Sequence, residues 1–143
     1  MGEGVEAAAP GALSLLLRHA SAGSRRRWEG DDKLRSLDAR GCRQAEALVE
    51  LLLPFGVRRV VSSPYVRCVE TVGPLAAALG VEVELDDRLA EGAGGSALEL
   101  LREDGVVVCT HGDVIEHVLD RGLKKGAAVF LRGGVVAGEI PAP

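Results

Sequence analysis

The stretch Leu13-Ser14-Leu15-Leu16-Leu17-Arg18-His19-Ala20 organises the rest of the chain. Its apolar run shows no helical period, which is typical of a strand that is buried on both faces of a parallel sheet. The run ends abruptly at Arg18 and His19, a cation beside an imidazole. Open parallel sheets bind ligands at the carboxyl ends of their strands, so we expect these two side chains to belong to a functional site.

Further strands and helices alternate after this first strand. We predict strands over residues 57–61, 81–85 (an edge strand) and 106–109 (a central strand), and helices over residues 38–53, 64–79, 96–103 and 113–121, with a closing hairpin over 128–140. This alternation indicates an α/β fold, a three-layer α/β/α sandwich with a mostly parallel central sheet.

The predicted helices carry recognisable start and stop signals. Asp38 is expected to cap the first long helix, whose apolar face includes Cys42. Ser63 is expected to act only as the cap of the next helix, which Gly73-Pro74 would kink or divide. Gly122 can terminate the last helix.

The composition narrows the class of protein. The 143 residues suit one domain, predicted over residues 12–143, preceded by a disordered segment over residues 1–11. A net charge of -4 argues against general nucleic-acid binding. We find no signal peptide and no apolar stretch of about 18 to 20 residues, and therefore expect no membrane association. The three cysteines lack a CxxC spacing, which favours reduced thiols and a cytoplasmic location.

The predicted topology brings several polar strand ends to one edge of the sheet. Four polar segments and two helix N-termini are expected to meet there. The segments are Arg18-His19, residues 62–67 with Arg67, Glu91 and Thr110-His111. Arginines and helix N-termini are typical phosphate ligands. The sequence has no Walker-type glycine loop and no carboxylate cluster for Mg²⁺, so we expect no cofactor and no metal. An imidazole among arginines favours catalysis through a phosphohistidine.

Four motifs in order resemble the signature of the histidine phosphatase superfamily, which is phosphoglycerate mutase-like in fold. They are Arg18-His19-Ala20, Leu37-x-x-Arg40-Gly41-x-x-Gln44-Ala45, Ser62-Ser63-Pro64-x-x-Arg67-x-x-Glu70-Thr71 and Thr110-His111-Gly112. The small size and the Arg-His-Ala variant resemble the SixA-like phosphohistidine phosphatases. Residues 22–32 also resemble the phosphatase domain that follows a Nudix hydrolase domain in some bacterial proteins.

The resemblance implies a role for each matching residue. His19 corresponds to the nucleophile, Arg18 and Arg67 to the phosphate-binding arginines, and His111 to the second histidine. Glu91 is the candidate proton donor, for which the SixA-like branch has no obvious equivalent. Ser62 and Gly112 are expected to contact substrate.

The loop over residues 21–37 has no periodicity, and long loops in compact domains are often functional. One interpretation is an ordinary exposed loop. The other is that Arg25 and its neighbours guide an acidic or nucleotide substrate, with Trp28 stacking on a base.

The expected function is a metal-independent phosphatase that acts on phosphohistidine in proteins, or on small phosphorylated substrates, through a phospho-His19 intermediate. One alternative is a nucleotide or phosphoanhydride phosphatase akin to the Nudix-linked domains. Another is a non-catalytic, phosphate-binding regulatory domain. A mutase is disfavoured, because so short a chain leaves little for a closed pocket. The expected partner is a phosphorylated protein, metabolite or nucleotide.

Overall fold

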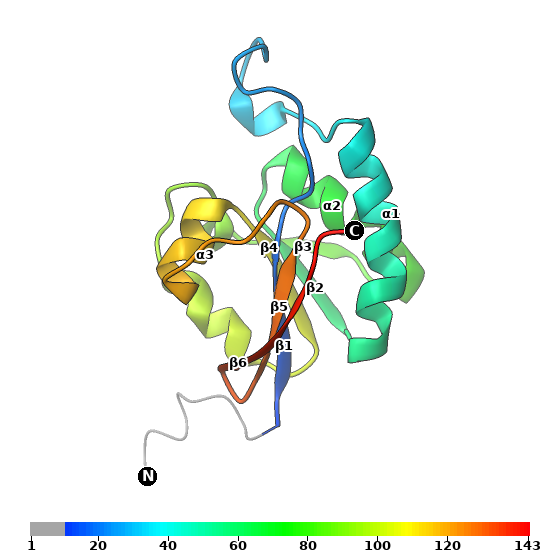
Figure 1. The fold of residues 1–143 in the computed structure, drawn as a ribbon, viewed down its shortest axis with the longest axis vertical. Helices are drawn as coiled ribbons and strands as arrows, with labels where there is room; N and C mark the ends of the chain where they lie inside the picture. The colour runs from blue at the N-terminus through cyan, green and yellow to red at the C-terminus, as the bar shows by residue number, and fades with distance from the viewer. Residues whose placement is uncertain (1–10) are drawn as a thin grey trace.

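A computed structural model describes residues 11–143, so the predicted disordered segment lies outside the described residues except for Gly11. A six-stranded sheet has the order β3-β2-β4-β1-β5-β6. Its strands are β1 (Leu13–Arg18), β2 (Arg59–Ser62), β3 (Val83–Leu85), β4 (Val106–Thr110), β5 (Ala128–Arg132) and β6 (Val135–Ile140). Strands β1 to β4 are parallel, β5 is antiparallel to β1, and β6 is antiparallel to β5. Helices cover both faces (Figure 1), which confirms the predicted three-layer sandwich.

The apolar run of β1 is continuous because both faces of the strand are covered. Leu15 and Leu17 pack into the core beneath α1 (Ala39–Leu52) and α2 (Val66–Leu79). Leu16 packs into the opposite core, with α3 (Gly112–Leu119) and the 3₁₀ helix η5 (Ser96–Arg102). The shorter 3₁₀ helices are η2 (Asp32–Leu34), η3 (Leu53–Phe55) and η4 (Asp87–Leu89). β4, predicted to be central, is buried throughout and pairs with β1 and β2.

Helix α1 begins at the predicted cap, since the Asp38 carboxylate accepts a hydrogen bond from the Gly41 N–H at 2.8 Å. Its buried face is formed by Gly41, Gln44, Ala45, Leu48 and Leu52. Cys42 was predicted on that face but is exposed, because the helix turns Gly41 toward the core. A Cβ atom on Gly41 would lie 1.8 Å from the Ser21 carbonyl oxygen, so the loop after His19 approaches the helix at a point that only glycine permits.

Two other helix predictions are corrected. Helix α2 is not divided at Gly73-Pro74 but continues from Val66 to Leu79, because the buried Val72 and Leu75 hold it against the core despite the backbone donor that Pro74 lacks. Helix α3 ends at Leu119, and the cap that terminates it is Asp120 in the left-handed conformation (φ 58°) rather than Gly122. Over residues 11–143, no helix has the length and apolar character needed to cross a membrane.

Candidate active site

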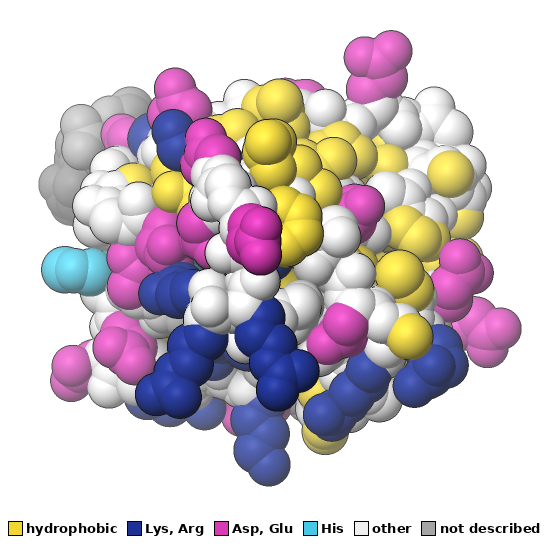
Figure 2. All heavy atoms as spheres, turned by 90° about the horizontal axis from the view of Figure 1, so that it is seen from above, with side chains coloured by type: hydrophobic (Ala, Val, Ile, Leu, Met, Phe, Trp, Pro, Cys, Tyr) yellow, Lys and Arg dark blue, Asp and Glu magenta, His cyan; other side chains and the backbone are white. Residues whose placement is uncertain are grey.

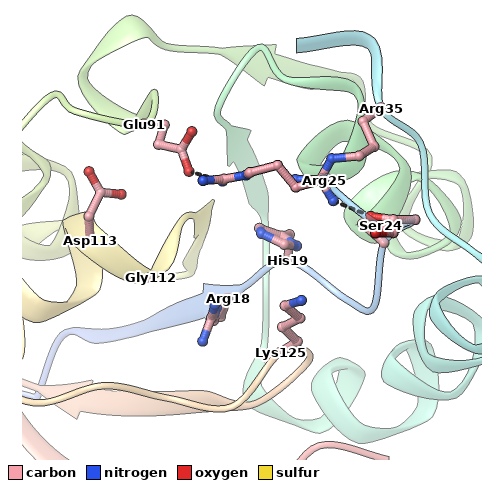
Figure 3. A pocket seen from close by; sticks show the side chains of 11 residues that line it. Arg18, His19, Ser24, Arg25, Arg35, Glu91, Gly112, Asp113 and Lys125 are labelled. Atoms are coloured by element: carbon pink, nitrogen blue, oxygen red, sulfur yellow. Dashed lines mark hydrogen bonds and ion pairs between the residues drawn. The ribbon is translucent and has the colours of Figure 1, made fainter. Parts of the chain in front are cut away.

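A cavity of about 380 Å³ opens at the carboxyl ends of β1 and β4 (Figure 3). In the parallel pairing of β1 with β4, Leu17 lies opposite Cys109 and Arg18 lies opposite Thr110. The next residues, His19 and His111, therefore follow at neighbouring positions. The residues that line the cavity are Arg18, His19, Ala22, Gly23, Ser24, Arg25, Arg35, Glu91, Gly112, Asp113 and Lys125. The structure thus brings Arg18, His19, Glu91, Gly112 and Arg25 together, as expected from the sequence.

His19 presents a neutral imidazole at the end of β1. Its Nδ1 lies 2.8 Å from the Ala20 carbonyl oxygen, and since a carbonyl only accepts, Nδ1 carries the proton and Nε2 keeps its lone pair. The side chain is 5% exposed. Burial lowers its pKa to about 3, and His111, Arg67 and Arg18 act in the same direction against the Ala20 hydrogen bond. The imidazole is therefore uncharged at neutral pH.

Arg18 lies at the strand end beside His19. Its guanidinium donates to the Leu123 carbonyl oxygen at 2.7 Å, while Nε has no hydrogen-bond partner. Gly112 packs directly on this group, because a Cβ atom there would lie 3.1 Å from Arg18 Cζ. Any larger residue at position 112 would press on the guanidinium. The structure thus shows a close approach of Gly112 to Arg18, and the contact of Gly112 with substrate stays a prediction.

Arg67 is fully buried and comes from the first turn of α2. Its guanidinium donates to the Asp32 carbonyl oxygen at 2.9 Å and to Asp32 Oδ2 at 3.1 Å, and it lies over the Tyr65 ring at 5.0 Å. A guanidinium has five N–H donors, so donors remain for a ligand, including the unpartnered Nε. Arg67 does not line the cavity, but it lies 3.7 Å from Glu91, which does.

His111 meets His19 edge to face, with ring centroids 5.4 Å apart. Its Nε2 lies 2.9 Å from Ser63 Oγ and 3.6 Å from Cys68 Sγ, which leaves the buried Nδ1 without a partner. Ser63 was predicted to be only a helix cap. The cap residue is instead Tyr65, and the Ser63 hydroxyl orients His111 while it accepts from the Tyr65 N–H.

Glu91 is engaged by two arginines. Arg25 reaches across the cavity above His19 (Figure 3) and pairs with Glu91 Oε2 at 2.8 Å, while Arg67 lies 3.7 Å from Glu91 Oε1. Glu91 must leave Arg25 before it can donate a proton through that oxygen. The geometry therefore places the candidate acid at the site without making it a ready donor.

Two predicted substrate contacts are not brought to the cavity. Ser62 is fully buried, and its hydroxyl donates to the Ser63 carbonyl oxygen at 2.8 Å. Trp28 is 38% exposed, and its Nε1 donates to the Asp31 carbonyl oxygen. Neither residue lines the cavity. Both positions were inferred from neighbouring motifs, which do not define the direction of a side chain.

Sequence reasoning missed Arg35, Asp113 and Lys125, all of which line the cavity. Arg35 is buried and pairs with Asp32 three residues earlier, a spacing visible in the sequence. Asp113 directly follows the Thr110-His111-Gly112 motif, and its Oδ2 accepts from the Gly92 N–H. Lys125 lies in a segment without any motif, so nothing in the sequence pointed to it.

Among residues 11–143, the buried side-chain N and O atoms without a hydrogen-bond partner are few, and all belong to this site. They are Arg18 Nε, Arg67 Nε, His111 Nδ1 and Asp113 Oδ1. Buried polar groups are normally satisfied, and exceptions are common where a ligand binds. Within the same residues, no group of three or more His, Cys, Asp or Glu side chains could hold a metal ion.

Comparisons with known proteins agree with this geometry. Residues 14–102 match the model of the histidine phosphatase superfamily (branch 1). An 8-oxo-(d)GTP phosphatase of Mycolicibacterium smegmatis is 38% identical over an alignment of 115 residues that covers 74% of this chain and 36% of that protein. The chain thus spans about a third of the length of this relative.

Solved structures show the same fold. A protein from Agrobacterium tumefaciens, assigned as the phosphohistidine phosphatase SixA, superposes with a TM-score of 0.76 at 20% identity, over 92% of this chain and 99% of that one. The protein histidine phosphatase SixA in complex with tungstate gives 0.70 at 18% identity, over 90% and 96%. The chain belongs to the histidine phosphatase superfamily and has the fold of its SixA-like members.

Proposed function

We propose that the chain is a phosphatase that works through a covalent phospho-His19 intermediate. One observation carries the proposal, namely that His19 donates Nδ1–H to the Ala20 carbonyl oxygen and so keeps an unprotonated Nε2 at neutral pH. The neighbouring arginines add cations that suit a phosphoryl group. The phospho-His19 mechanism uses no metal ion, so we expect the protein to be active in the presence of a chelator.

The reaction has two steps. Nε2 of His19 attacks phosphorus, and the N–P bond forms as the P–O bond to the leaving group breaks and its electron pair departs with that oxygen. Arg18, Arg67 and His111 balance charge on the three remaining phosphoryl oxygens. Water then attacks phosphorus, and the N–P bond breaks to release inorganic phosphate and the neutral imidazole.

The substrate class that we favour is a nucleotide phosphoanhydride. A phosphate leaving group departs without a proton, which suits a site whose carboxylate is held by Arg25. The name of the M. smegmatis relative supports this choice. Phosphohistidine on a protein is the second candidate, since its leaving group also tolerates a weak acid and the cavity is open.

The test is phosphate release in EDTA from GTP, GDP, a phosphohistidine protein and p-nitrophenyl phosphate. We expect turnover by the wild type, loss in His19→Ala, and no loss in His117→Ala, a matched control because His117 is exposed on α3. Radiolabel from the substrate is expected on His19 in an acid-labile form. Full activity of His19→Ala would refute the mechanism. A folded wild type that releases phosphate from none of the four would favour the regulatory binding domain.

A further inference from the structure

A second hollow lies beside the active-site cavity. It has a volume of about 320 Å³ and is lined by Ser21, Arg40, Gln44, Lys124, Lys125 and Ala142. We call it the basic groove. Lys125 lines both the groove and the cavity, and Ser21 lies two residues after the nucleophile, so the two spaces adjoin.

The cations of the basic groove are not neutralised by ion pairs. No salt bridge within the described part of the chain includes Arg40, Lys124 or Lys125. The nearby acid is Asp38, whose carboxylate accepts from the Gly41 N–H and the Ser21 hydroxyl and whose single charge acts on both Arg40 and Lys125. Figure 2, which views the molecule from the side of the active site, shows Lys and Arg side chains gathered along one side of this face.

The lysines are held in place by the backbone of the catalytic strand end. The Gly126 N–H donates to the carbonyl oxygens of Arg18 and His19, at 3.2 and 3.0 Å, and the Ala127 N–H closes a turn on the Lys124 carbonyl oxygen at 2.9 Å. Figure 3 shows Lys125 beside Arg18 and His19. Burial lowers the pKa of Lys125, and the nearby Arg18 and Arg35 act in the same direction against Asp38.

We propose that the basic groove binds the phosphates of a nucleoside polyphosphate that extend beyond the phosphoryl group held at His19. The inference rests on the proposed function and specifies its substrate as one that carries several phosphates. Lys125 bridges the reacting phosphoryl and the next phosphate, and Arg40 and Lys124 hold the remainder. A substrate with a single phosphate makes only the contacts of the cavity.

Binding and turnover together test the proposal. Arg40→Ala and Lys124→Ala are made in the wild type and in a His19→Ala background, with Arg132→Ala as the control. Arg132 pairs with Leu13, at the end of β1 opposite His19, so its loss changes net charge equally at a remote place. Calorimetry in the His19→Ala background measures the Kd of inorganic tripolyphosphate and of orthophosphate. Steady-state assays give kcat/KM for GTP relative to p-nitrophenyl phosphate.

We expect each groove variant to weaken tripolyphosphate binding by about fivefold or more, with orthophosphate binding changed less and Arg132→Ala neutral. The GTP preference is expected to fall in parallel. Unchanged tripolyphosphate binding in both groove variants would overturn the proposal that the basic groove binds phosphates, even if the wild type proves to be a phosphatase. Weakened binding in a protein that hydrolyses nothing would support the groove and refute the proposed function. If the groove variants lose activity on a phosphohistidine protein but keep activity on GTP, the groove does not bind nucleotide phosphates, and this result would indicate a protein partner.

Discussion

The buried, neutral His19 predicts an unusual dependence of stability on pH. Its pKa is lowered from 6.5 to about 3 by burial and by the neighbouring cations. The unfolded chain therefore binds a proton at this site below pH 6.5, whereas the folded protein does so only near pH 3, and stability falls as the pH decreases through this window. At pH 5 the solution is 1.5 pH units below the pKa of His19 in the unfolded chain. At ~1.36 kcal/mol per unit, this lowers the free energy of unfolding by about 2 kcal/mol.

Urea unfolding at pH 7.5 and pH 5.0, in buffers without phosphate, measures this cost. His19→Asn removes the titration and keeps a polar side chain, while the exposed His117 on α3 remains in both proteins. We expect the wild type to lose about 2 kcal/mol more than the variant between the two pH values, a difference in midpoint of about 1 M urea. An equal loss in both proteins would show that folding does not lower the His19 pKa, and the argument for a neutral nucleophile would fail.

Three further outcomes follow from packing and ion pairs. Gly41→Ala is expected to lower the free energy of unfolding by about 1–3 kcal/mol, because the new Cβ meets the Ser21 carbonyl oxygen, whereas Gly73→Ala, which meets nothing within 4 Å, is expected to raise it by about 0.5–1 kcal/mol. Urea unfolding distinguishes the two, and equal stabilities would contradict the close approach. Arg67→Lys is expected to lower kcat/KM by about 100-fold in steady-state assays, since an ammonium cannot reproduce the fork of donors; wild-type kinetics would limit Arg67 to a structural role. Arg25→Ala is expected to lower kcat/KM at least about threefold while Arg26→Ala does not, because of these two arginines Arg25 is the one that lines the cavity above His19; identical kinetics for the two variants would mean that the arginine above His19 is not used.

Much of the site could be predicted because motif residues follow strand ends. A buried strand that stops at Arg18-His19 and another that stops at Thr110-His111 must place these residues together once the strands are parallel neighbours. The helix cap Asp38 and the first-turn position of Arg67 also follow from local signals. These features depend on periodicity and on short-range backbone chemistry.

The contacts between distant segments could not be predicted in this way. The sequence determines the strand ends, the order of the motifs and the excess of arginine at one edge of the sheet. Three contacts depend instead on side-chain directions and on loops from distant parts of the chain. They are the ion pair of Arg25 with Glu91, the hydrogen bond of the Ser62 hydroxyl to a backbone carbonyl, and the position of Lys125 beside His19. Such contacts form only when the packed core brings the loops to one edge, because no local period or cap specifies them.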